Sequence, residues 1–242
     1  MLIRSCLAPG LLIAATSMLI ESATAQESTE APGAEVAEHM HEHLSAISAM
    51  KTFIIAGQLD GMREPAVWME EHVATPGLPG DWEPYVTQMR RYAGEAASAR
   101  HLVFAAASVS EMARVCGDCH EANGAEVGLG NIGSPPADNQ DVRTQMRRHL
   151  WAVNRMWQGL IGPSDSAWTG GSEVLAMVRV KASDIARVPS EEPQVGYLIK
   201  RLREIGAAGS EATSRETRSV LYGELLSLCA DCHTWTGGGP GN

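Results

Sequence analysis

The sequence predicts an all-α protein built from two tandem four-helix bundles. Apolar residues recur at three- and four-residue steps through most of the chain, and no stretch alternates apolar and polar residues as a half-buried strand would. A third observation is an internal repeat, because the pattern of residues 34–123 returns in residues 138–242. Each repeat has the length of an ordinary domain. We therefore expect one bundle over each of these two ranges.

Composition and charge restrict the class of protein. The chain has 242 residues, of which 44% are apolar and 20% charged, as in a globular protein. Its formal net charge is -10, and no run of Lys and Arg interrupts the acidic balance. Binding to DNA or RNA requires a basic surface that neutralises phosphates. We therefore exclude a nucleic-acid partner.

Residues 1–25 have the layout of a secretory signal peptide. Arg4 precedes an apolar run over residues 7–20, and small residues lead to an expected cleavage site after Ala25. The apolar run is shorter than the roughly 20 residues that span a bilayer. We expect a cleaved signal, a periplasmic protein and no stable membrane insertion after cleavage. An uncleaved anchor is the alternative.

Three stretches of the first unit recur in the second unit. They are residues 116–120, which return as 229–233, residues 85–94, which return as 197–206, and residues 40–50, which return as 146–156. The last pair is related by an offset of 106 residues. The chain is therefore an internal duplication.

In the first unit the periodicity predicts four helices. Apolar residues at helical spacing indicate a helix over residues 40–54, a short helix near 64–73 and a third over 82–97. The alanine-rich segment 99–120 predicts the fourth helix. Residues 74–80 are rich in Pro and Gly and are expected to form a loop.

The second unit repeats this plan less clearly in its middle. We expect its helices at residues 146–160, 172–187, 194–208 and 213–233. Gly162-Pro163 and Gly170-Gly171 interrupt the pattern before the second of these helices. The last helix opens with a capping-box-like sequence from Thr213 to Glu216. The Gly/Pro-rich residues 123–137 are expected to link the two units.

Each unit ends in a Cys-x-x-Cys-His motif, which is the attachment site of c-type haem. The two thiols lie about one helical turn apart, so they can form thioethers with the two vinyl groups of one porphyrin, and the adjacent His then reaches the iron. The thioether residues would be Cys116, Cys119, Cys229 and Cys232. The proximal iron ligands would be His120 and His233. The sequence thus predicts two covalently bound haem c groups.

Two other uses of paired cysteines explain the motifs less well. A zinc site formed by both cysteine pairs would leave the His after each pair without a role. A thioredoxin-like redox pair needs a βαβ unit, and the helical pattern offers none. Covalent haem attachment uses all three side chains of each motif.

The position of the motif on the last helix of each unit resembles that in the class II cytochromes c, the cytochrome c prime family. Members of that family are four-helix bundles that carry haem on the final helix, and the resemblance covers nearly all of the mature chain, twice over. The widespread single-haem cytochrome c fold, from which di-haem peroxidases are built, has its motif near the N-terminus instead. The resemblance implies two bundles, each with a covalently attached c-type haem on its C-terminal helix.

The first helix supplies the distal side of the haem in the resembled family. There, an apolar residue leaves the iron five-coordinate in gas-binding members, and Met closes it in electron-transfer members. Matching the first helix by its end puts His43 at this position, which departs from the family, and His149 recurs at the same place. We predict that His43 and His149 are the distal iron ligands.

Other residues leave alternatives to this ligand set. A histidine on the apolar side of a helix can be an ordinary buried residue. Four methionines also recur and can either bind iron or fill the core: Met40, Met50, Met146 and Met156. Four histidines have no counterpart in the repeat: His39, His41, His72 and His101. We interpret His72 and His101 as surface or boundary residues.

The predicted function is electron transfer without catalysis. Six-coordinate haems that keep both ligands suit a carrier of single electrons between periplasmic or membrane-bound redox proteins. The charge of -10 favours partners with a basic docking face. We expect a monomer, because an internal duplication can replace the homodimer common in the resembled family. The alternative function is binding or sensing of NO or CO at an open distal site; a peroxidase ranks last, because no distal acid-base motif is visible.

Overall fold

The computed structural model describes residues 31–72 and 80–239, and its regular structure there is entirely helical. The α-helices of these residues are α1 (Ala31–Ile55), α2 (Leu59–Glu71), α3 (Glu83–Ser98), α4 (Leu102–Ala122), α5 (Val142–Ile161), α6 (Asp165–Ala176), α7 (Ala182–Ile185), α8 (Glu192–Glu211) and α9 (Arg215–Thr236). No strand occurs in the described ranges, which confirms the all-α prediction. The predicted signal peptide, residues 1–25, lies outside them.

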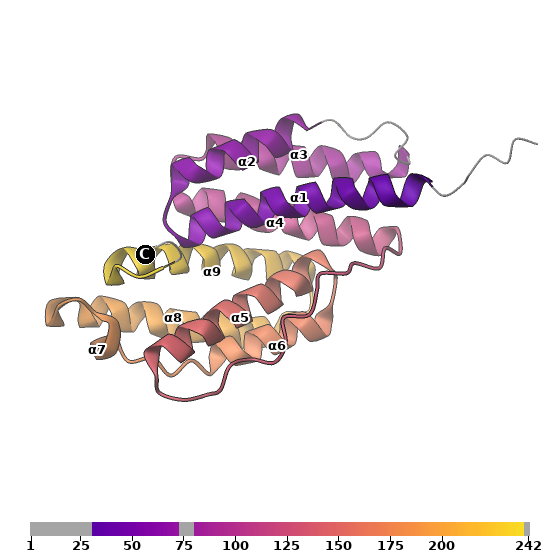
Figure 1. Cartoon of the computed structure of the whole chain (residues 1–242). Coiled ribbons are helices and arrows are strands. Elements are labelled where there is room, and N and C mark those ends of the chain that lie inside the picture. The colour runs from indigo at the N-terminus through magenta and orange to yellow at the C-terminus, as the bar shows by residue number, and fades with distance from the viewer. Residues whose placement is uncertain (1–30, 73–79, 240–242) are drawn as a thin grey trace, which may run out of the picture.

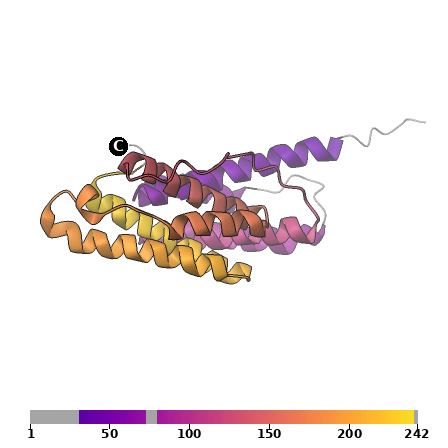
Figure 2. The same cartoon turned by 90° about the horizontal axis from the view of Figure 1, so that it is seen from below.

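The helices form two groups. Within the first group, α1 to α4 pack against one another in chain order, and α4 also contacts α1. In the second group, α5, α6, α8 and α9 pack in the same order, and α9 also contacts α5. Figure 1 shows the first group above the second, with α9 beside α4. Figure 2 shows that the long helices of both groups lie roughly along one common axis.

Helices α4 and α9 join the two groups and run antiparallel. Arg215, at the start of α9, forms an ion pair of 2.7 Å with Asp118, near the end of α4. One turn further along α9, the hydroxyl of Ser219 donates a 2.6 Å hydrogen bond to Glu111. His233 lies 18 residues beyond Arg215, about 27 Å along the helix at 1.5 Å per residue. The two Cys-x-x-Cys-His motifs are therefore near opposite ends of the α4/α9 pair.

The buried core crosses the boundary between the two groups. Met112 of α4 and Leu226 of α9 are fully buried and belong to the same apolar cluster. Tyr222 of α9 is also fully buried in this cluster, where its ring stacks at 5.4 Å on Trp157 and its hydroxyl donates to the carbonyl oxygen of Val153. The two groups of helices thus share a continuous interior.

The middle of the second unit differs from the sequence prediction. The prediction of a helix over residues 172–187 was wrong. Helix α6 starts at Asp165 and ends at Ala176, and it includes Gly170-Gly171. A Cβ atom on Gly171 would lie 2.7 Å from the carbonyl oxygen of Ala152 in α5. The glycine therefore allows α6 to approach α5 closely and does not interrupt the helix.

Several helix starts also differ from the prediction. The helices expected over residues 40–54 and 146–160 begin earlier, at Ala31 and Val142. The helix expected near residues 64–73 begins at Leu59, so Pro65 lies inside it. The last helix begins at Arg215, where the hydroxyl of Ser214 accepts a hydrogen bond from the backbone N–H of Thr217. This is an N-cap one residue later than the expected capping box. None of the described helices is long and apolar enough to cross a bilayer.

Candidate functional site

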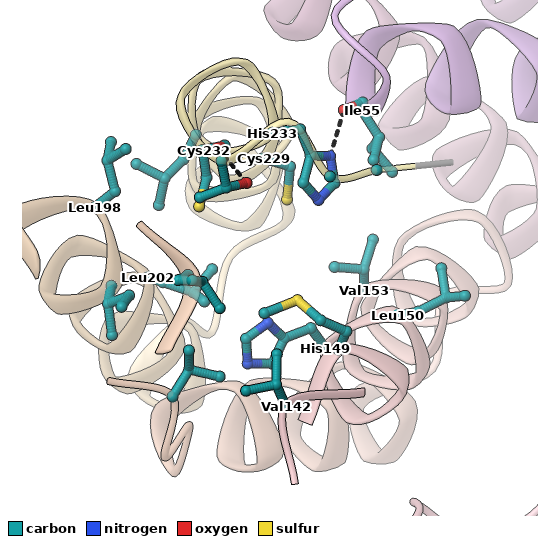
Figure 3. A pocket seen from close by; sticks show the side chains of 18 of the residues that line it. Ile55, Val142, His149, Leu150, Val153, Leu198, Leu202, Cys229, Cys232 and His233 are labelled. Atoms are coloured by element: carbon teal, nitrogen blue, oxygen red, sulfur yellow. Dashed lines mark hydrogen bonds between the residues drawn. The ribbon is translucent and has the colours of Figure 1, made fainter. Parts of the chain in front are cut away.

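The second Cys-x-x-Cys-His motif opens onto a cavity of about 530 Å³. Helix α9 contributes Cys229, Cys232 and His233 to its wall, and α5 contributes His149. Figure 3 shows His149 across the cavity from His233, with both cysteines on the same side as His233. The structure therefore brings the predicted distal residue of this unit into one cavity with its motif.

The rest of the cavity wall is mainly apolar. Val153, Leu198 and Leu202 are among its lining side chains, and α8 supplies the two leucines (Figure 3). Arg143 and Arg147 also line it, and no Asp or Glu is among these described lining residues. A large apolar group that carries carboxylates would suit this lining, because guanidinium groups bind carboxylates well.

His149 is a partly buried histidine, and one of its ring nitrogens has no hydrogen-bond partner within the described residues. Its Nε2 is inaccessible to solvent and has no hydrogen-bond partner there. Burial, with smaller contributions from the nearby His233, Arg148 and Arg203, lowers the pKa of His149 to about 4. The ring is therefore neutral near pH 7. A buried polar atom without a partner costs about 1–3 kcal/mol of stability. An iron atom bound at Nε2 of His149 would supply the missing partner, so this residue fits the role of a haem ligand.

His233 is held by a backbone group of the other group of helices. Its Nδ1 lies 2.8 Å from the carbonyl oxygen of Ile55, the last residue of α1 (Figure 3). A carbonyl can only accept, so Nδ1 carries the proton in this bond and Nε2 keeps its lone pair. Such a bond orients a metal-binding His and raises its basicity.

The same arrangement recurs at the first motif. Nδ1 of His120 lies 2.8 Å from the carbonyl oxygen of Ile161, the last residue of α5. Ile55 and Ile161 are equivalent positions, separated by the 106-residue offset of the duplication. Each motif histidine is thus fixed by the end of the first helix in the opposite unit.

Close packing accompanies this contact at the first motif. A Cβ atom on Gly117 would lie 2.2 Å from the carbonyl oxygen of Leu160, so the glycine allows α4 to reach the end of α5. The equivalent position in the second motif is Ala230, whose side chain is buried. The first of the two residues between the cysteines therefore depends on the helix that packs there.

The four motif cysteines are free thiols in this structure. Burial raises the pKa of Cys116 and of Cys229 to about 12, and it also raises those of Cys119 and Cys232. Thiols of this kind are poor thiolate ligands and poor redox nucleophiles. The two pairs also lie near opposite ends of α4 and α9, so they cannot converge on one zinc ion.

The structure brings His43 together with two histidines that the sequence did not connect to it. His39 lies one turn before it on α1, and His72 caps the C-terminal end of α2. Nitrogen atoms of the three rings lie within 4.8 Å of one another. Nε2 of His43 is buried without a hydrogen-bond partner, and burial lowers its pKa to about 3. The i, i+4 spacing of His39 and His43 was the signal available in the sequence.

The recurring methionines divide into two kinds. Met50 and Met156 are fully buried in the core, which supports the core-filling interpretation. Met146 lines the cavity of the second motif and is therefore a competitor of His149. Val180 and Ile185 line the cavity of the second motif. Their counterparts in the first unit fall in residues 74–79, which lie outside the described residues.

Comparisons with protein-family models, curated proteins and solved structures give no match for this chain. The resemblance to class II cytochromes c therefore depends on the two motifs and on the order of the helices. The carbonyl groups of Ile55 and Ile161 could not be predicted as partners of the motif histidines, because long-range backbone contacts leave no local signal in the sequence. The positions of Arg143 and Arg147 in the cavity wall were likewise not predicted.

Proposed function

We propose that the chain is a di-haem c-type cytochrome that carries single electrons between periplasmic redox partners and has no enzymatic role. Each group of four helices would be a bundle of the class II cytochrome c type, with a haem attached to its last helix. The observation that carries this proposal is the unpaired, buried Nε2 of His149, in a cavity that is also lined by Cys229, Cys232 and His233.

A bound haem would supply an iron atom that gains and loses one electron. The chain would hold that iron through Nε2 of His233 and of His149, and the thiols of Cys229 and Cys232 would become thioethers. The apolar wall would exclude water, and the two arginines of the wall would neutralise the propionates. Because the imidazole of His149 is neutral near pH 7, this ligand need not exchange a proton when the iron changes charge.

The first unit would repeat this arrangement. Cys116 and Cys119 would form its thioethers, His120 would be the proximal ligand and His43 the distal ligand. Two features support this: His120 has the same type of carbonyl partner as His233, and His43, like His149, has a buried Nε2 without a partner.

The distance between the motifs bears on how electrons would move. Electron tunnelling weakens steeply with distance, and the motifs lie near opposite ends of the α4/α9 pair. We therefore propose that each haem exchanges electrons mainly with a partner at its own end of the molecule. The net charge of -10 favours partners that present basic docking surfaces.

Spectra of the purified holoprotein test the distal ligands. EPR of the ferric form and absorption of the reduced form, with and without CO, are compared for the wild type, His43→Ala and His149→Ala. We expect two low-spin haems that do not bind CO in the wild type. Each alanine variant should turn one haem high-spin and open it to CO.

Met146→Leu is the matched control at the second site, because Met146 lines the same cavity as His149. Its spectra should equal those of the wild type. High-spin haems with rapid CO binding in the wild type would contradict the proposal and indicate gas binding instead. A spectral change in Met146→Leu with none in His149→Ala would assign the thioether as the ligand.

A further inference from the structure

The three histidines at the α1/α2 contact are built into the fold. His39 and His43 lie on one face of α1 because they are four residues apart, and α1 packs against α2, whose C-cap is His72. His39 and His43 are 5% and 9% exposed, and the ring of His72 stacks at 4.1 Å on Trp68. Three imidazoles from two helices thus occupy a mostly buried position.

The spacing of their nitrogen atoms matches that of ligands around one metal ion. Nε2 of His72 lies 3.3 Å from Nδ1 of His39. Two nitrogen ligands of a tetrahedral zinc ion, each at about 2.0–2.1 Å, are about 3.4 Å apart. One ligand atom from each of the three histidines lies within 4.8 Å of the others, so small side-chain rotations would complete the set.

The charge state of the cluster also favours a cation. Burial is the main cause that lowers the pKa of His39 and of His43, so both rings are neutral and able to bind a metal near pH 7. A carboxylate oxygen of Glu42 lies 3.8 Å from Nε2 of His72 and adds negative charge at the edge of the cluster. The buried, unpaired Nε2 of His43 would gain a partner on binding.

The second unit lacks this cluster. At the 106-residue offset, His39 corresponds to Gln145 and His72 to Val178, while His43 corresponds to His149. The duplication therefore retains the single histidine in both units and has the two additional ones in the first unit alone.

From this geometry we infer that His39, His43 and His72 form a binding site for a divalent transition-metal ion that prefers imidazole ligands, with Zn²⁺ as the probe. His43 is then shared, because it is also the distal ligand proposed for the first haem. Binding of Zn²⁺ would withdraw His43 from the iron and open the first haem to an external ligand, while the second haem stays closed. Binding itself does not require the proposed function, but the opening of the first haem rests on it.

The test measures bound zinc and haem spin state in the same holoprotein samples. Protein freed of adventitious metal by a chelator is titrated with Zn²⁺ at neutral pH, with binding followed by calorimetry and metal analysis, and the ferric EPR and CO binding of the reduced form are recorded. We compare the wild type with His39→Gln and His72→Val, which install the residues of the second unit. The control is His41→Ala, whose side chain is exposed on the same helix.

We expect the wild type and His41→Ala to bind one zinc ion per chain, and His39→Gln and His72→Val to lose that site while keeping both haems. Zinc should convert only the first haem of the wild type to a high-spin, CO-binding form. Equal zinc binding in all four proteins, or none in the wild type, would overturn the site. Zinc bound with the first haem still low-spin would overturn the sharing of His43.

Failure of the proposed function has a different signature. A first haem that is already high-spin without zinc would contradict His43 as its ligand. The difference in zinc stoichiometry between the wild type and the two variants would still decide whether the metal site exists.

Discussion

Lys51 is a buried cation that links α1 to α5. Its ammonium donates a 2.8 Å hydrogen bond to Asn154 and lies 5.0 Å from the ring centre of Trp157. A cation over an indole ring is attracted to it, yet removal from water penalises the charged form. Burial therefore lowers the pKa of Lys51 from 10.5 to about 8.

This shift predicts a pH dependence of stability. Since the folded-state pKa is below the unfolded value, the unfolded chain binds the proton more tightly between pH 8 and pH 10.5. Stability should therefore rise with pH in this window, by about 2 kcal/mol from about pH 7.5 to about pH 10. Lys51→Met should remove this rise, as measured by urea unfolding at both values. An equal rise in both proteins would show that Lys51 is not its source.

At the scale of single residues, the sequence pointed to the two motifs and to His43 and His149 as the proposed distal ligands. The motif carries its chemistry in adjacent positions, and His43 and His149 recur in the duplication. The grouping of His39 with His72 could not be predicted in this way. It depends on the packing of α2 against α1, which brings together residues 33 positions apart.

Helix packing explains why the two motifs differ at the first of the two residues between their cysteines. The carbonyl of Leu160 approaches α4 so closely that only glycine fits at position 117, and the next carbonyl, of Ile161, binds His120. Periodicity predicted most of the helices because their apolar residues face a common core. It was wrong for the helix expected at residues 172–187, because α6 begins at Asp165 and the chain leaves the helix after Ala176. Gly171 lies inside α6 and allows its close approach to α5.

Gly117→Ala should disturb the first motif through α5. The added methyl would force the Leu160–Ile161 backbone away and weaken the hydrogen bond to His120. If His120 binds iron as proposed, its imidazole would then be a weaker donor. We expect lower stability and a higher reduction potential for the first haem, with the second unchanged, in a spectroelectrochemical titration.

The reverse substitution in the second motif, Ala230→Gly, is the control for this element. It removes a buried methyl and leaves the carbonyl of Ile55 beside His233. Its second haem should keep the wild-type potential despite a small loss of stability. The interpretation would be contradicted by a Gly117→Ala protein whose first haem also keeps its wild-type potential.

The whole molecule is held together by the contact between its two halves. The apolar core is continuous across α4 and α9, and each motif histidine depends on a carbonyl of the opposite unit. The repeat in the sequence predicted two similar units, but no local pattern could show that they share an interior.

A shared core predicts cooperative unfolding. Calorimetry of the holoprotein should give one transition with equal calorimetric and van't Hoff enthalpies. A fragment of residues 26–137 should lack a cooperative transition, because it leaves the α4 surface that packs on α9 exposed to water. Two separate transitions in the full chain would show that the units are independent domains.

The central claim is that each Cys-x-x-Cys-His motif holds a covalent haem, and intact mass spectrometry of the denatured, exported protein tests it most directly. The account predicts a polypeptide mass increased by two haem groups that acidic acetone does not extract. Replacing both cysteines of one motif by alanine should remove one haem group from the mass. An unmodified polypeptide mass from cells that attach haem to another c-type cytochrome would contradict the account.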